Sequence, residues 1–223
     1  MPFTQRRKQL LDIARTIVLE SGVGRLTMAA IAEGSGVSRS VVYDHFNNVE
    51  AVAIALLCDH YQRATAFTVE RIRDPDTIFD YFDILIDTMF DLHRRGMPLS
   101  RTITSGFPRN SDVTAFHAEH HKLVLDVYQE LLQQQGISEA RSRLAAHVLA
   151  DMIDTAAIGF AANNKATDRE ALKMMVQGAI SNLVRGGGVK PSVPVESLNK
   201  MSAAVSFRMP ISSVATLGRS RGR

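Results

Sequence analysis

The sequence predicts an all-α protein that folds as a small N-terminal domain followed by a larger helical one. Apolar residues recur at helical spacing along most of the chain, for example at Leu10, Ala14 and Ile17. Capping residues precede such segments and glycine follows them, as Thr27 and Gly36 do around one of them. The length of 223 residues is enough for two domains of unequal size.

Composition is that of an ordinary globular protein, with 45% hydrophobic and 22% charged residues. The longest apolar runs, residues 52–58 and 156–162, are about a third of the length that spans a bilayer, so no membrane segment is expected. Asp12 and Arg15 interrupt the apolar core that a signal peptide would need, which favours a cytoplasmic location. A single cysteine, Cys58, excludes an internal disulfide and a cysteine-rich zinc site.

The segment of residues 26–50 has the spacing of two short helices joined by a tight turn. Thr27 is expected to cap the first helix, over residues 28–33, with its hydroxyl. Ser38 is expected to cap the second helix, over residues 39–46. A Gly-Ser-Gly sequence separates them, because glycine takes the positive φ that a tight turn requires. The pattern predicts a helix-turn-helix.

The second of these helices is expected to have two distinct faces. Val42 and Phe46 lie four residues apart and share the inner face. The outward positions form a surface that is able to enter a groove, and they are Arg39, Ser40, Val41, Tyr43 and Asp44. A surface hairpin of two helices has the same spacing, so spacing alone leaves that alternative open.

The identities of the residues help to decide between a helix-turn-helix and an ordinary surface hairpin. In order along the chain, the informative ones are Glu20-Ser21-Gly22, Thr27, Ile31-Ala32, Gly36-Val37-Ser38, Val42-Tyr43, His45-Phe46 and Glu50. With these residues the N-terminal part of the chain resembles the TetR family of bacterial helix-turn-helix transcriptional regulators. Two positions depart from the family pattern: Val49 stands where lysine is usual, and Ser40 where glycine is common.

The resemblance implies a homodimer that binds double-stranded DNA. It also implies that Thr27, Tyr43 and His45 contact phosphate while the second helix reads bases in the major groove. A basic cluster at residues 6–8 is positioned to approach phosphates as well. The predicted DNA-binding residues are Thr27, Ser38, Arg39, Ser40, Val41, Tyr43, Asp44 and His45.

A long helix is predicted next, over residues 48–73, and at about 40 Å by the helical rise it can belong to two domains. The predicted division is a DNA-binding domain over 1–47 and a ligand-binding and dimerisation domain over 48–185. A flexible basic tail is predicted for 186–223, which contains six basic side chains and one acidic one.

The helix expected after Pro75 has one acidic stripe on an otherwise apolar surface. The stripe consists of Asp80, Asp83, Asp87 and Asp91. Because the stripe lacks histidine and convergent partners, a solvated face is favoured over a metal site, and no chemistry is assigned to it.

Phenylalanine and methionine are abundant in the central helices, which indicates either an ordinary core or an adaptable apolar pocket. A pocket would take a small apolar or amphipathic ligand and carry few polar groups, among which His120 is suggested by the family resemblance. The expected lining residues are Phe82, Ile86, Met89, Phe90, His93, Thr102, Phe116, His120, Met152 and Thr155.

The last two predicted helices, over residues 139–163 and 169–185, carry more apolar surface than one core face requires. Small residues such as Ala156, Gly159 and Gly178 would let helices approach closely. A four-helix dimer interface is the simplest account and agrees with the resemblance, although a thick monomeric core is an alternative.

Together these patterns predict a ligand-responsive transcriptional regulator, most simply a repressor, that binds an inverted-repeat operator as a homodimer and is released by a small molecule. No enzymatic activity, cofactor or metal is predicted. One alternative is a TetR-like DNA-binding protein that takes no ligand or answers to a protein partner. A second is a helical metalloenzyme that uses His117, His120 and His121, because histidines at i and i+4 can bind a metal from one helical face.

Overall fold

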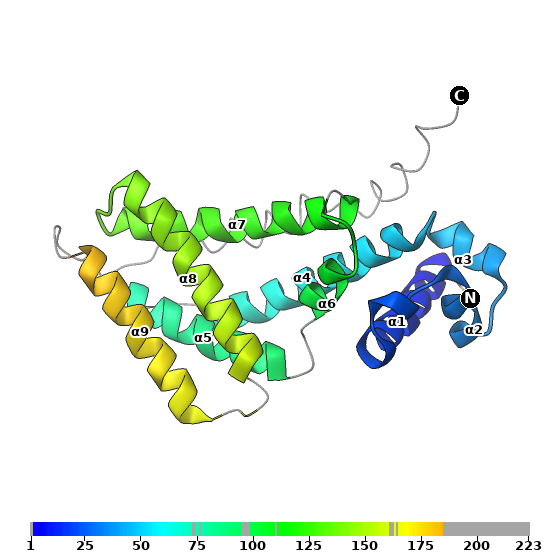
Figure 1. Ribbon diagram of the computed structural model, residues 1–223, viewed down its shortest axis with the longest axis horizontal. Coiled ribbons are helices and arrows are strands. Elements are labelled where there is room, and N and C mark those ends of the chain that lie inside the picture. The colour runs from blue at the N-terminus through cyan, green and yellow to red at the C-terminus, as the bar shows by residue number, and fades with distance from the viewer. Residues whose placement is uncertain are drawn as a thin grey trace. The chain divides into compact units, whose positions relative to one another are not determined.

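The computed structural model describes residues 2–72, 75, 77–94, 99–109, 111–160, 163 and 165–184, and every regular element in these ranges is a helix (Figure 1). The prediction of an all-α fold is therefore confirmed. The elements are α1 (Phe3–Ser21), the 3₁₀ turn η1 (Val23–Arg25), α2 (Met28–Ser35), α3 (Arg39–His45), α4 (Val49–Arg71), α5 (Ile78–Arg94), α6 (Leu99–Ser105), α7 (Asp112–Gln134), α8 (Glu139–Phe160) and α9 (Ala166–Val184). No helix in the described part of the chain is both long and apolar enough to cross a membrane.

Contacts divide the chain into two compact units, and both α4 and α7 contribute residues to each. Among the described residues, the first unit contains 2–62, 99–109 and 111–119, and the second contains 63–72, 75, 77–94, 120–160, 163 and 165–184. The predicted domains, 1–47 and 48–185, are each one continuous segment of the chain. This division into domains stays a prediction. The predicted tail, 186–223, lies outside the described residues.

The first unit is built around the inner faces of α1 to α4 and α6. Leu10, Ile31 and Val42 are fully buried in its core, together with Leu56 and Ile103. The inward stripe predicted for α1 is confirmed, because the buried residues of that helix recur every four positions. The segment after α6 lies against η1 so closely that a Cβ on Gly106 would overlap the side chain of Val23. Glycine is therefore required where α6 meets the N-terminal helices.

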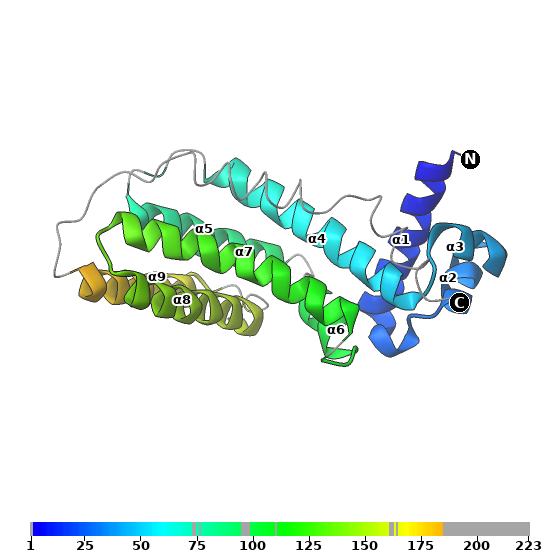
Figure 2. The ribbon, with the colours of Figure 1, turned by 90° about the horizontal axis from the view of Figure 1, so that it is seen from above.

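The second unit packs α5 against α8 and α9, which lie side by side (Figure 2). Its core contains an aromatic cluster in which Phe82 meets Tyr81 and Tyr128 edge-on, with ring centroids 5.3 and 5.2 Å apart. Such edge-to-face pairs bring the positive edge of one ring to the negative face of the next.

Local capping fixes the ends of the two central helices. The Asn48 side-chain oxygen accepts from the Ala51 N–H at 2.8 Å and starts α4. At the start of α5, the Thr77 hydroxyl accepts from the Asp80 N–H at 3.2 Å, and the Asp80 carboxylate accepts from the Thr77 N–H at 2.9 Å. The sequence predicts that this helix starts directly after Pro75, whereas the capping residue is Thr77.

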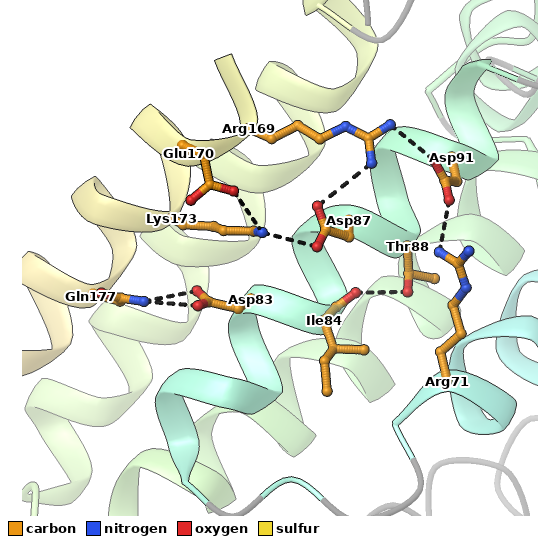
Figure 3. Close-up of polar contacts among 10 residues, drawn as sticks. All are labelled: Arg71, Asp83, Ile84, Asp87, Thr88, Asp91, Arg169, Glu170, Lys173 and Gln177. Atoms are coloured by element: carbon orange, nitrogen blue, oxygen red, sulfur yellow. Dashed lines mark hydrogen bonds and ion pairs between the residues drawn. The ribbon is translucent and has the colours of Figure 1, made fainter. Parts of the chain in front are cut away.

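Three of the four aspartates in the acidic stripe of α5 have partners on α9, which corrects the prediction of a solvated face without convergent partners. Figure 3 shows three of its carboxylates turned towards the side chains of α9. Asp83 accepts from the amide nitrogen of Gln177 at 2.9 Å, and Asp87 pairs with Lys173 at 2.9 Å. An amphipathic pattern in the sequence records only that these positions are polar, whereas their partners come from a helix about ninety residues later in the chain, a separation that helical periodicity does not reach.

Asp91, the last member of the stripe, has 15% of its side chain exposed. One carboxylate oxygen pairs with Arg169 of α9 at 2.8 Å, and the other pairs with Arg71, the last residue of α4, at 2.8 Å. Burial acts to raise the pKa of Asp91, but the hydrogen bonds from Arg169 and Arg71 outweigh it, so the pKa lies below its usual value. Asp91 thus joins three helices of the second unit.

We expect Asp91→Asn to lower the free energy of unfolding by about 1–3 kcal/mol, because two arginines lose a shared charged acceptor. Since the pKa of Asp91 is lowered by folding, this stabilisation is present above the pKa of the unfolded carboxyl and is lost as the pH falls through the folded value. Urea denaturation at several pH values measures both effects. Asp126→Asn, an exposed change on α7, is the control, and equal effects of the two substitutions would contradict the assignment.

Candidate nucleic-acid interface

The first helix of the predicted motif is α2, and Thr27 caps it as expected: the side-chain oxygen accepts from the Ala30 N–H at 3.0 Å. The helix continues through Ser35, two residues beyond the predicted end. Gly34 therefore lies inside α2 rather than in the turn. A Cβ at this position would lie 2.9 Å from the Ile13 side chain, so glycine here lets α1 approach α2 closely.

The turn begins at Gly36, which has φ 67° and ψ 28° in the left-handed region. Its N–H donates to the Glu33 carbonyl at 3.2 Å, and the Val37 N–H donates to the Ala32 carbonyl at 3.1 Å. These two bonds satisfy carbonyls that the end of α2 leaves without helical partners. The chain then turns into α3.

The second helix is α3, and its N-cap is Ser38 as predicted, although the Ser38 side chain makes no capping hydrogen bond. The Ser38 and Ser40 hydroxyl oxygens instead lie 2.7 Å apart and share a hydrogen bond. The helix ends at His45, one residue before the predicted end, because Phe46 is extended at φ −144°.

The two faces of α3 are those that helical rotation predicts. Val42 is 0% exposed and Phe46 is 2% exposed, and both belong to the core of the first unit. On the other face Tyr43 is 53% exposed. The remaining outward positions divide into exposed Arg39, Ser40 and Asp44 and half-buried Val41 and His45. The result is a short polar ridge on a buried apolar base.

His45 lies against Phe3 of α1, with ring centroids 4.1 Å apart. Burial lowers the pKa of His45, the positive charges of Arg7 and Arg6 lower it further, and Asp44 acts in the opposite direction. In the free protein these causes together favour the uncharged form of the imidazole.

A sequence model of the bacterial regulatory proteins of the tetR family matches residues 10–56, which contain α2 and α3. The helix-turn-helix of this chain is therefore of the TetR type. The regulator UidR of Escherichia coli K12 is 26% identical to it over 136 residues, which cover 58% of this chain and 67% of UidR. These relatives are transcriptional regulators, not enzymes, and this chain is a transcriptional regulator of the TetR type.

Solved structures of similar fold extend the likeness beyond the N-terminal helices. SCO4454, a TetR-family regulator from Streptomyces coelicolor, superposes with a TM-score of 0.67 at 19% identity, covering 81% of this chain and 97% of that one. FadR from Bacillus subtilis, solved in complex with stearoyl-CoA, has a TM-score of 0.57 at 21% identity and covers 80% of this chain and 98% of its own. At these identities the likeness establishes the fold.

The predicted pocket residues are divided between the two units. Thr102 and Phe116 belong to the first unit. The other eight belong to the second, where Phe82, Ile86 and Phe90 are fully buried, Met89 and Met152 pack against the same core, His93 and His120 are half-buried, and Thr155 is exposed. The His93 ring nitrogen Nδ1 lies 2.8 Å from the Met89 carbonyl oxygen, within hydrogen-bond distance.

Tyr81 is not among the predicted pocket residues, but it is fully buried beside Phe82 and its hydroxyl makes no hydrogen bond. Burial raises the pKa of Tyr81 far above its usual value, so the hydroxyl keeps its proton. A buried hydroxyl without a partner is unfavourable by about 1–3 kcal/mol and marks a place where a polar atom of a ligand would be stabilised. In the sequence, the feature that could have indicated this residue is a tyrosine within an otherwise apolar helical stripe.

The metalloenzyme alternative relied on three histidines of α7, namely His117, His120 and His121. No group of three or more histidine, cysteine, aspartate or glutamate side chains is arranged to hold a metal ion within the described ranges. His117 Nδ1 lies 2.5 Å from the Tyr61 hydroxyl, and the two rings stack with centroids 6.1 Å apart. His117 therefore links α7 to α4 inside the first unit.

We expect Gly36→Ala to lower the free energy of unfolding by about 1–2 kcal/mol, the penalty that an L side chain meets in the left-handed region. Gly24→Ala is a matched control. A Cβ meets nothing within 4 Å at either position, but only Gly36 has a positive φ. Chemical denaturation of both variants measures the difference, and equal stabilities would show that the turn does not depend on the conformation of Gly36.

Proposed function

We propose that this TetR-type regulator is a repressor that binds an inverted-repeat operator as a homodimer and dissociates when it binds a small molecule. The observation that carries the proposal is the exposed polar ridge of α3 above buried Val42 and Phe46. A helix of this kind fits the major groove, where the edges of all four base pairs can be distinguished.

Contacts to phosphate and contacts to bases are assigned to different residues. Phosphate contacts are assigned to Thr27, Tyr43 and His45, as the family resemblance implies, and also to Ser38. Bases are assigned to the exposed side chains of Arg39, Ser40 and Asp44, and to Val41 beside them. Arginine suits guanine, a serine hydroxyl accepts several bases, and aspartate accepts from the amino group of cytosine.

A homodimer formed by α8 and α9 is supported by the apolar side chains that these helices leave exposed. On α8, Leu144 is 68% exposed and Val148 is 54% exposed. On α9, Met174 and Met175 are 67% and 62% exposed. Apolar side chains gathered on two neighbouring helices are typical of surfaces that associate.

A small-molecule site is proposed in the second unit, around the buried part of α5. The predicted residues Phe82 and Met89 lie in or against this core, and the Tyr81 hydroxyl offers an unused hydrogen-bond donor. The complex of FadR with stearoyl-CoA supports an amphipathic ligand as the first class to test. A ligand releases DNA only when it binds the non-binding conformation more tightly, typically by about 1–3 kcal/mol.

The base contacts can be tested by selecting duplexes from a random library with each variant. We expect changes of Arg39, Ser40 or Asp44 to alter the selected sequence. Tyr43→Ala serves as the comparison, because losing a phosphate contact should weaken binding to all duplexes alike. If the combined variant at the three base-contacting positions selects the same sequences as the unaltered protein, α3 does not read bases.

The ligand proposal can be tested with amphipathic compounds, stearoyl-CoA among them, added to the protein bound to its selected duplex. We expect a compound that dissociates the complex to have no effect on Met89→Trp, because the indole fills space beside the core of the second unit, where the ligand is proposed to bind. DNA binding by the variant without the compound is the control. Continued release of Met89→Trp would place the ligand elsewhere.

A further inference from the structure

Arg7 is turned inward from the second turn of α1 and is half-buried, whereas its neighbour Lys8 is exposed. The Arg7 Nη1 donates a hydrogen bond to the backbone carbonyl of His45 at 2.7 Å. The same guanidinium lies over the ring of Phe46, with its central carbon 4.1 Å from the ring centroid. One side chain of α1 thus holds two consecutive residues at the end of α3.

The carbonyl that Arg7 binds belongs to the last residue of α3, which has no partner within the helix. A cation at this position also interacts favourably with the negative end of the helix dipole. The hydrogen bond and the interaction with the helix dipole both matter for α3, because α3 has seven residues. Helices this short are unstable unless tertiary contacts hold them.

Phe3 adds a second contact from α1 to the same place, because its ring lies 4.1 Å from the ring of His45. Burial lowers the pKa of Arg7, which agrees with a guanidinium that has exchanged water for protein partners. Arg6 is also engaged and donates to Gln9 of its own helix at 2.6 Å. Of the predicted phosphate-contacting cluster at residues 6–8, only Lys8 is exposed.

We propose that Arg7 is a positioning residue for DNA recognition, which fixes the C-terminal end of α3 and with it the direction of the base-contacting ridge. The proposal rests on the proposed role of α3 in DNA binding. It assigns Arg7 no contact with phosphate. A planar guanidinium suits the task because it donates in its own plane while its face lies on an aromatic ring.

The contact can be tested first in the free protein, without DNA. The Phe46 N–H closes the last turn of α3 by donating to the Val42 carbonyl at 3.0 Å. We expect Arg7→Ala to speed amide hydrogen exchange at Phe46 by about tenfold, since local opening no longer breaks a hydrogen bond to a charged group. Lys8→Ala is the matched control, and unchanged exchange in Arg7→Ala would overturn the proposal.

The second test compares binding to a duplex that the protein selects from a random library with binding to a random duplex of equal length. We expect Arg7→Ala to lower the ratio of the two affinities by about tenfold, because a loosened α3 loses base contacts more than phosphate contacts. A smaller folded fraction reduces both affinities equally and leaves this ratio unchanged, so the ratio separates positioning from general destabilisation. Arg7→Lys should not restore it, since an ammonium lacks the planar face.

A phosphate contact predicts a different result. Arg7→Ala would then weaken both duplexes equally, reduce the slope of log K against log salt by about 0.9, and be rescued by lysine. That outcome would overturn the positioning role. If the unaltered protein selects no sequence at all, the proposed function fails, and amide exchange at Phe46 still decides whether Arg7 holds α3.

Discussion

Burial of one face of α3 determines what its other face can do. Val42 and Phe46 are enclosed by the core that α1 and α2 provide, so the helix has a single orientation in the first unit. The polar ridge opposite them is exposed for that reason and not through any preference of its own residues. A seven-residue helix would not persist without this burial.

The helix α1 supports this arrangement in several ways. Its apolar stripe fills the core, its N-terminal turns hold the end of α3 through Arg7, and Arg15 forms an ion pair with Asp59 of α4. Gly34 allows the close approach of α2 that these contacts require. The helices that pack behind α3 therefore fix the orientation of its exposed ridge. In the second unit Asp91 has a comparable role, because it joins the ends of helices through two arginines.

Features that depend on neighbouring residues could be predicted from the sequence, and features that depend on distant ones could not. Thr27 capping, the buried pair on α3 and the helical stripe of α1 all follow from local spacing. The partners of the aspartate stripe were missed because Arg169 lies seventy-eight residues beyond Asp91. The inward direction of Arg7 was missed for the same reason. A basic residue near a helix start is ordinarily solvated, and only the folded position of His45 shows otherwise.

We propose that two copies of α3 present their ridges to successive turns of one DNA duplex. This arrangement can be tested with a base-resolution footprint of the protein on a duplex selected from the source genome. We expect two protected half-sites related by twofold symmetry, with centres about 34–36 Å apart or a multiple of that distance. Protection of a single half-site, or of a site without twofold symmetry, would contradict it.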